Sequence, residues 1–366
     1  MPAVDMNANS VYEKFNTSQL KELALAAGLP SETVNRLRSK EALTRAIDSL
    51  SDRDRLALLS HRVEAISPYK HCVLLEVENS FTYKGTCEAL TKSFATIIDS
   101  FQPLQSDARD LCPQLFINDV AAERFFIKFA HMVDVWETTP SPDDQQVKSK
   151  VRKRHIMVAE INSRTQLVSI HFPGFTQVVV GKERVTYSLF AQEAVQILES
   201  KTGLKLIPFR LKPVTDILLD DIDEGVVDLR RTLRFKRGGK MDLDSESDED
   251  AASTLAQGLA NTGVKISAEA IRLAFRSSEA QSVVLLWQKQ QIITRASMRN
   301  SLPEILFIWN EVEPSQSIID DILGRLSWAR SYLVSDGMKK ARDYVNQAQA
   351  GELLCPFWLE QQFAIT

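Results

Sequence analysis

The chain has 366 residues, of which 44% are hydrophobic and 25% are charged, and its formal net charge at pH 7 is −4. These fractions are typical of a globular protein, and the length predicts two or three domains. The slight acidic excess excludes a protein that attracts nucleic acid through its overall charge, so any phosphate binding has to come from local basic segments.

The first part of the chain has helical patterns. Residues 17–27 have leucine and alanine at helical spacing, and Gly28 ends that pattern. After a linking stretch at 31–39, a second helix is expected at 39–50 and a third at 51–63. The sequence thus predicts a small helical module at the front.

Pro68 marks a change to mixed patterns. The segment 71–85 is rich in Val, Leu, Phe and Tyr and predicts a strand or hairpin, and 88–101 predicts a helix. The strongly apolar stretch 119–135 predicts a helix, or a helix that runs into a strand. The clearest alternation lies at 155–173, which predicts two strands joined by a turn.

The second half repeats this mixture. A helix is expected at 187–200, and 225–244 predicts a hairpin that turns at a Gly-Gly pair. The acidic, serine-rich stretch 242–262 is expected to be a linker or exposed loop. Strands over 282–296 and 303–312 follow a helix that Ser267 caps, and helices at 317–334 and 336–350 come next.

These patterns predict a multidomain α+β protein, with a small N-terminal helical module followed by two mixed α/β regions that have antiparallel strands. The expected divisions are a helical module, a central domain with a basic hairpin, an acidic linker and a C-terminal domain with terminal helices, at residues 1–67, 68–241, 242–262 and 263–366.

The N-terminal module has a recognisable motif. Its apolar residues and the start of its second helix are Leu20, Leu23, Ala24, Gly28, Leu29, Lys40, Glu41, Ala42, Leu43 and Ile47. With this spacing, residues 17–50 resemble the helix-extended-loop-helix modules of the SAP and Rho N-terminal type. The resemblance implies DNA or RNA binding through the second helix and the preceding loop. It would place Arg36, Arg38, Lys40 and Arg45 at the phosphates.

Two further segments are basic. The first precedes a predicted strand and contains Lys148, Lys150, Arg152, Lys153 and Arg154. Such a run either contacts a phosphate backbone, acts as a localisation signal or is simply solvated.

The second basic segment is the hairpin at 225–244, with Arg230, Arg231, Arg234, Lys236, Arg237 and Lys240. Side chains alternate across a strand, so a basic face of this hairpin is expected to lie along a nucleic-acid groove. We favour this segment as the binding site. The alternative is that the acidic residues at 242–250 pair with this hairpin and mask its basic residues.

Catalytic signatures are missing from the sequence: we find no phosphate-binding loop, dinucleotide fingerprint, nucleophile elbow or H-E-x-x-H motif. The five histidines are expected to be structural, and His155 and His171 are the pair that strand geometry would bring close. Glu76, Glu78 and Glu160 near strands suggest a divergent metal-dependent nuclease, but the usual lysine two residues away is missing.

The cysteines indicate neither a zinc site nor a disulfide framework, because Cys72, Cys87, Cys112 and Cys355 include no C-x-x-C pair. The start lacks a signal-peptide pattern, and no apolar run approaches the roughly 18 residues of a membrane span. We expect a cytoplasmic protein, or a nuclear one in a eukaryote, without metal or other cofactor.

The leading hypothesis is a non-enzymatic protein that binds the phosphate backbone of nucleic acid, with DNA favoured over RNA and with little sequence specificity. The alternatives are a protein-protein adaptor or assembly subunit that uses the N-terminal helices and the C-terminal region, and the divergent nuclease. Trp287, Trp309, Trp328 and Trp358 are expected to be core residues.

Overall fold

The fold is given by a computed structural model that describes residues 12, 15–67, 69, 71–98, 100–105, 107–140, 146–173, 179–180, 183–184, 187–220, 225–234, 240–245, 250–276, 279–297, 305–309 and 316–333. Helices and antiparallel strands make up an α+β fold with a helical N-terminal region, as expected. The chain forms two compact units. The first contains Met1–Tyr69 and Val77–Ile207, and the second contains Lys70–Glu76 and Pro208–Thr366.

The helical region of the first unit consists of α2 (Thr17–Ala26), α3 (Ser31–Arg36), α4 (Lys40–Asp48) and α5 (Arg53–Ile66). Each of the three predicted helices is confirmed, and a side chain caps each N-terminus: Asn16 for α2, Ser39 for α4 and Asp52 for α5. The short helix α3 occupies most of the expected linking stretch.

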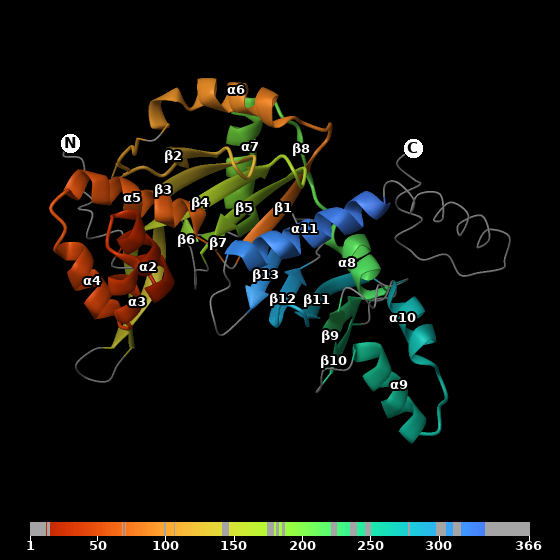
Figure 1. Cartoon of the computed structure of the whole chain (residues 1–366). Coiled ribbons are helices and arrows are strands. Elements are labelled where there is room, and N and C mark those ends of the chain that lie inside the picture. Colours follow the sequence, from red (N-terminus) through yellow and green to blue (C-terminus); the bar gives the residue numbers. More distant parts are fainter. Residues whose placement is uncertain are drawn as a thin grey trace. The chain divides into compact units, whose positions relative to one another are not determined.

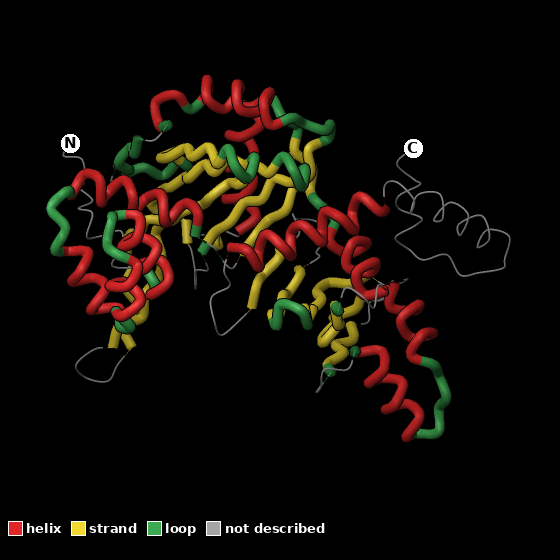
Figure 2. Tube along the Cα trace, viewed as in Figure 1, coloured by secondary structure: helices red, strands yellow, loops and turns green. Residues whose placement is uncertain are grey.

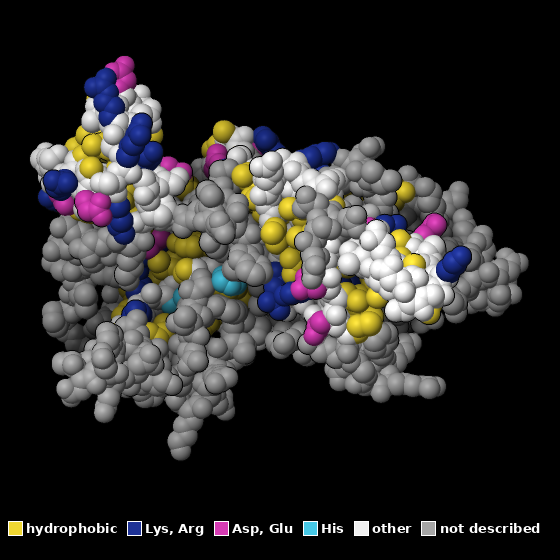
Figure 3. Space-filling view, turned by 90° about the horizontal axis from the view of Figure 1, so that it is seen from below, with side chains coloured by type: hydrophobic (Ala, Val, Ile, Leu, Met, Phe, Trp, Pro, Cys, Tyr) yellow, Lys and Arg dark blue, Asp and Glu magenta, His cyan; other side chains and the backbone are white. Residues whose placement is uncertain are grey.

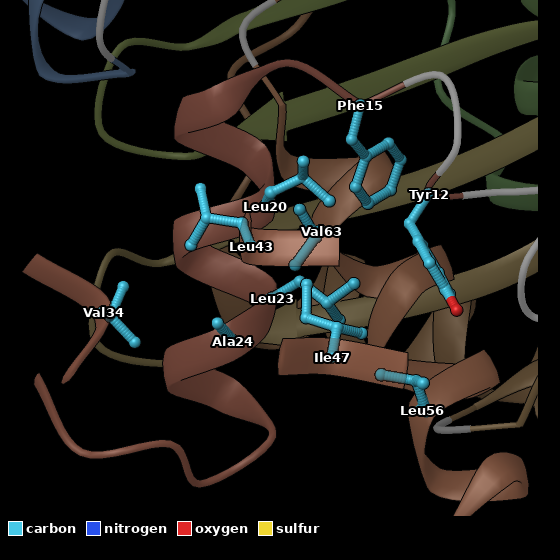
Figure 4. Packing of buried hydrophobic residues seen from close by; sticks show 10 residues of the cluster. All are labelled: Tyr12, Phe15, Leu20, Leu23, Ala24, Val34, Leu43, Ile47, Leu56 and Val63. Atoms are coloured by element: carbon cyan, nitrogen blue, oxygen red, sulfur yellow. The ribbon is translucent and has the colours of Figure 1, made fainter. Parts of the chain in front are cut away.

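These helices share a hydrophobic core of their own, drawn in Figure 4. Leu20, Leu23 and Ala24 from α2 pack with Leu43 and Ile47 from α4, and all five are fully buried. Burying a leucine or isoleucine side chain stabilises a fold by about 1.5–3 kcal/mol, so this cluster gives α2–α5 a large part of their stability. The helical spacing in the sequence therefore identified the core of the region.

The antiparallel sheet of the first unit has the order β5-β4-β3-β2. Its strands are β2 (Cys112–Asp119), β3 (Arg124–Pro140), β4 (Gln146–Asn162) and β5 (Leu167–Phe172). The predicted hairpin at 155–173 is confirmed as the end of β4 and β5, whereas the helix expected at 119–135 is wrong.

The wrong helix has a physical cause. A strand covered on both faces is apolar at nearly every position, so it loses the alternation that would distinguish it from a buried helix. Phe125, Phe126, Ile127 and Phe129 of β3 are all buried, although they alternate between the two faces. β3 is such a strand.

Helices cover both faces of this sheet (Figures 1 and 2). On one face, α5 packs through Ala65 against Leu115, Phe126, Ile156 and Val158. The other face meets α6 (Tyr83–Ser93) and α7 (Tyr187–Thr202). There the rings of Tyr83 and Phe125 stack, and Phe190 contacts His131 and His155. The predicted α7 is confirmed, and α6 begins five residues before its expected start, at the Thr82 cap.

The antiparallel strands of the second unit have the order β10-β9-β11-β12-β13-β1. They are β1 (His71–Val77), β9 (Val226–Arg234), β10 (Lys240–Asp244), β11 (Glu279–Trp287), β12 (Ile292–Ser297) and β13 (Ile305–Trp309). The predicted hairpin at 225–244 is confirmed as β9 and β10. The single strand expected at 282–296 is instead the hairpin of β11 and β12.

The helices of the second unit are α8 (Leu211–Asp220), α9 (Ala251–Asn261), α10 (Ala268–Arg276) and α11 (Gln316–Tyr332). The expected acidic linker at 242–262 contains the end of β10 and the whole of α9. Asp250 begins α9 by accepting hydrogen bonds from the backbone N–H groups of Ala252 and Ser253. An acidic, serine-rich stretch therefore supplies a helix cap here.

The remaining short elements are η1 (Ala95–Ile97), β6 (Val179–Val180), β7 (Glu183–Arg184) and β8 (Leu206–Pro208). The helix expected at 336–350 and the C-terminal segment lie outside the described residues.

Candidate nucleic-acid interface

Strands β3 and β4 form an unusually long hairpin. They pair antiparallel over 17 residues each, from Arg124 opposite Asn162 to Pro140 opposite Gln146. β2 pairs with β3 only as far as Ala130, and β5 pairs with β4 only as far as Val158. Within the described strands, the outer half of β3 and β4 is therefore a two-stranded ribbon, which we call the basic ribbon.

Basic residues occupy every second position of the outer half of β4. Positions 148, 150, 152 and 154 share one face of the ribbon because successive strand residues point to opposite faces. Asp134 lies opposite Arg152 and Trp136 lies opposite Lys150 in the register. The run KSKVRKR is thus sorted by strand geometry into one basic face, and Lys153 lies on the other face, where it is exposed.

Two of these side chains are open to solvent. Lys150 is 45% exposed and Arg152 is 41% exposed. Both contact the carboxylate of Asp134 at 3.0 Å. Their hydrogen bonds lower the pKa of Asp134 below its ordinary value. Two cations share this one carboxylate. The side chain of Lys148 lies outside the described residues.

Arg154 is turned inward instead. Its guanidinium contacts the carboxylate of Glu64 on α5, and both side chains are buried. Glu64 also contacts Lys128 of β3, which is 0% exposed. Nζ of Lys128 lies 2.6 Å from Nδ1 of His61, and the His61 ring stacks on Phe101 with centroids 3.4 Å apart. We call His61, Glu64, Lys128 and Arg154 the buried ion cluster.

Burial and charge shift the pKa values of this cluster in opposite directions. Burial would raise the pKa of Glu64, but the charges of Lys128 and Arg154 outweigh it and lower that pKa. Burial lowers the pKa of Lys128 to about 7, against the raising effect of Glu64. Burial, together with the charge of Lys128, lowers the pKa of His61 to about 3. Glu64 is therefore ionised and His61 is neutral at neutral pH.

The helical region places its predicted phosphate-binding residues on the surface. Arg36, Arg38 and Lys40 are exposed around the N-terminus of α4, where the Ser39 side chain accepts a hydrogen bond from the N–H of Ala42. Arg45 donates through Nε to the carbonyl of Glu41. The stretch expected to be extended is helical in α3 and extended only at Leu37 and Ser39.

The basic hairpin of the second unit is arranged differently. Arg231 is buried and lies 2.6 Å from Asp228 and 3.5 Å from Asp216, and its guanidinium also lies over the ring of Phe275. Arg230 is exposed and paired with Asp244, one of the acidic residues that the masking alternative named.

For the other basic positions of that hairpin, the structure describes at most the backbone register. Arg234 and Lys240 face each other in the register, and Lys236 and Arg237 lie outside the described residues. Figure 3 shows the coloured Lys and Arg side chains in separate groups, with acidic side chains beside several of them.

The histidines pair differently from the prediction. His155 lies 2.9 Å from His131, because these residues are opposite each other in the β3–β4 register. His171 contacts Ser169 at 2.7 Å and Glu160 at 3.7 Å. Both contacts involve Nε2 of His171, whereas a serine nucleophile needs its acid partner on the opposite ring nitrogen. This buried trio therefore lacks the geometry of a catalytic triad.

The carboxylates that suggested a nuclease are paired with cations. Glu76 contacts Arg330 at 2.9 Å, Glu78 contacts Lys205 at 2.7 Å, and Glu160 contacts Arg124 at 3.7 Å. Among the described residues, no three His, Cys, Asp or Glu side chains are grouped so as to hold a metal ion.

No family model matches the chain, and no curated protein is significantly similar to it. In the part of the chain that the structure describes, no helix is both long and apolar enough to cross a bilayer.

Sequence reasoning missed Glu64, Lys128 and Asp134, which decide the charge of the ribbon face. Lys128 had a signal, since it is a lone cation in the apolar run FFIKFAHM, and a buried lysine requires a carboxylate nearby. The sequence contains no such signal for Glu64 and Asp134, because only the tertiary contacts bring them to the basic residues.

Proposed function

We propose that the chain is a non-enzymatic protein that binds the phosphate backbone of nucleic acid through the basic ribbon, with little sequence specificity. The observation that carries this is the alternation of basic residues along β4, which lines one face of a two-stranded ribbon and leaves Lys150 and Arg152 exposed. Charge-assisted contacts from such side chains position a protein on phosphates without reading bases.

The shape of the ribbon favours DNA over RNA. A two-stranded β-ribbon fits the major groove of B-DNA, which is about 12 Å wide, and several DNA-binding proteins use strands in this way. The major groove of A-form RNA is too deep and narrow for this contact. A duplex DNA ligand therefore suits the ribbon best.

The helical region supports the same function as a second, weaker contact. Arg36, Arg38 and Lys40 are exposed, and the N-terminus of α4 adds a favourable helix dipole for an anion. The resemblance of residues 17–50 to SAP and Rho N-terminal modules points the same way. Glu32 and Glu41 lie among these residues and reduce the local positive charge, so we assign the larger share of binding to the ribbon.

The test is a salt series with the full chain and a fluorescent DNA duplex. Counterion release makes affinity fall with salt at a slope of about 0.9 per neutralised phosphate, so the affinity should fall steeply between about 50 and 200 mM salt. The double variant Lys150→Gln/Arg152→Gln should reduce that slope by about two. A duplex RNA of the same sequence should bind more weakly.

A matched control removes the same charge from elsewhere. Lys205→Gln/Arg230→Gln changes two exposed cations that are not part of the ribbon and that are each paired with a carboxylate, and it should leave the slope unchanged. Absence of any binding at low salt, or an equal loss in both double variants, would contradict binding through the ribbon.

A second candidate function is protein-protein contact through the second unit. Trp328 on α11 is 45% exposed and stacks on Tyr332, contrary to the core position expected for it, whereas Trp287 is fully buried as expected. Exposed aromatic residues of this kind are enriched at protein interfaces. Copurification of a protein partner that Trp328→Ala abolishes, without binding of DNA, would favour this adaptor role.

A further inference from the structure

The contact between His61 and Lys128 fixes the protonation state of the histidine. Nζ of Lys128 lies 2.6 Å from Nδ1 of His61, and a lysine ammonium has donors but no acceptor. Below the pKa of Lys128, about 7, its amine is an ammonium and Nδ1 must accept this hydrogen bond, which requires a neutral imidazole with its proton on Nε2. A protonated imidazole carries N–H groups at both nitrogens and would point one of them at the ammonium.

The charges around His61 make protonation costly. Glu64 comes from its own helix α5, Lys128 from β3 and Arg154 from β4. The cluster already holds two cations and one carboxylate, and Nη1 of Arg154 is buried without a hydrogen-bond partner. A third cation would be added in a site that Phe101 covers and that has no second carboxylate. Unbalanced buried charges of this kind are strongly destabilising.

The cluster lies where α5 meets the sheet. α5 has two buried sides: Leu56 and Val63 belong to the core of the helical region, and Ala65 packs on the sheet beside the ion cluster. The helical region therefore keeps its own core if α5 leaves the sheet. What joins α5 to the sheet is the ion cluster together with a few apolar contacts.

We propose that His61 is an acid-sensitive latch that holds α5 on the sheet while its imidazole is neutral and lets α5 go when the imidazole is protonated. Release would uncover Lys128 and Arg154, which continue the face of the basic ribbon. The latch does not depend on nucleic-acid binding.

The direction of the pH dependence follows from linkage. In the docked state the pKa of His61 is about 3, and in the released state it returns towards the ordinary value of about 6.5. Protons therefore bind preferentially to the released state, and docking weakens as the pH falls below about 6.5. For one proton the ratio of docked to released molecules changes by up to about tenfold per pH unit.

Amide hydrogen exchange, read peptide by peptide and corrected for the intrinsic effect of pH, tests the latch in the full chain. Between pH 7 and 4, peptides from α5 should lose protection at higher pH than peptides from β5. His61→Gln keeps an oxygen that accepts from Lys128 but cannot take up a proton, so it should move the loss in α5 to lower pH by about one unit or more. His171→Gln removes another buried histidine of the same unit and should leave the loss in α5 in place.

Three results would overturn the latch. The first is that α5 and β5 of the unmodified chain lose protection together. The second is that His61→Gln leaves the pH of α5 release unchanged. The third is that His171→Gln shifts it by as much as His61→Gln does. If His61→Gln does not fold at neutral pH, the comparison of α5 with β5 in the unmodified chain still tests the latch.

Discussion

Strands β4 and β9 both carry runs of arginine and lysine and each buries one arginine, Arg154 or Arg231, but their exposed cations differ in setting. β9 lies between β10 and β11, and α8 supplies Asp216 to its Arg231, so one of its basic residues is a buried structural ion and its neighbour Arg230 is paired with Asp244. The outer half of β4 has only β3 beside it among the described strands, and its Lys150 and Arg152 are exposed.

This difference shows that a basic run by itself does not define a binding surface. The neighbours of a strand decide whether its cations meet solvent or carboxylates, and a cation taken out of water needs a partner that stays with it. The hairpin at 225–244, which the sequence favoured, buries Arg231, whereas the basic run at 148–154 leaves Lys150 and Arg152 exposed.

The largest expected effect comes from replacing Arg231, the buried cation of β9. Arg231→Met would leave Asp228 buried without its cation and Asp216 with Lys212 alone, and should destabilise the second unit by about 3–5 kcal/mol. Urea unfolding measures this loss. Arg230→Met is the control next to it, and because its side chain is exposed it should leave the unfolding midpoint nearly unchanged.

Acid should lower the stability of the first unit more than that of the second. Burial lowers the pKa of His131 and of His171 to about 4, and that of His61 to about 3, whereas His71 is the one histidine of the second unit. The unfolded chain binds protons first at these histidines, so their contribution to the stability of the first unit is intact above about pH 6.5 and is lost as the pH falls towards 4. Each histidine contributes up to about 1.4 kcal/mol per pH unit.

Hydrogen exchange in urea at several pH values measures the two units separately. A loss of stability of equal size in the second unit would contradict the assignment of this effect to the buried histidines.

Removing an acidic neighbour should sharpen the contrast between the strands. Asp134→Asn takes away the carboxylate that both Lys150 and Arg152 contact, and it should raise affinity for duplex DNA at low salt on the order of threefold. Asp244→Asn removes the equivalent partner of Arg230 and should leave affinity unchanged. Fluorescence anisotropy measures both, and equal gains would contradict a special role for the ribbon.

The smallest effect belongs to the helical region. Arg36→Gln/Arg38→Gln should lower the salt slope of DNA binding by at most about one unit, because Glu32 and Glu41 already reduce the local charge. The same salt series measures it. A reduction larger than that of Lys150→Gln/Arg152→Gln would place the main contact on the helices instead.

Much of the local structure was readable from the sequence. Helices α2, α4, α5, α7 and α11 follow from apolar spacing and from capping residues such as Ser39 and Asp52, because those signals act within a few residues. The hairpins β4–β5 and β9–β10 follow from alternation next to turn residues. Strand β3 did not, since its two covered faces erase the alternation.

The sequence by itself determined the α+β class, the helical front with its leucine core and the positions of the basic runs. Only the tertiary structure decided which cations are buried. The partner of Arg154 is Glu64 of a helix, and Arg231 pairs with Asp216 of another helix as well as with Asp228 of its own strand. Charge balance depends on distances of a few ångströms between segments far apart in the chain, and neither composition nor periodicity contains those distances.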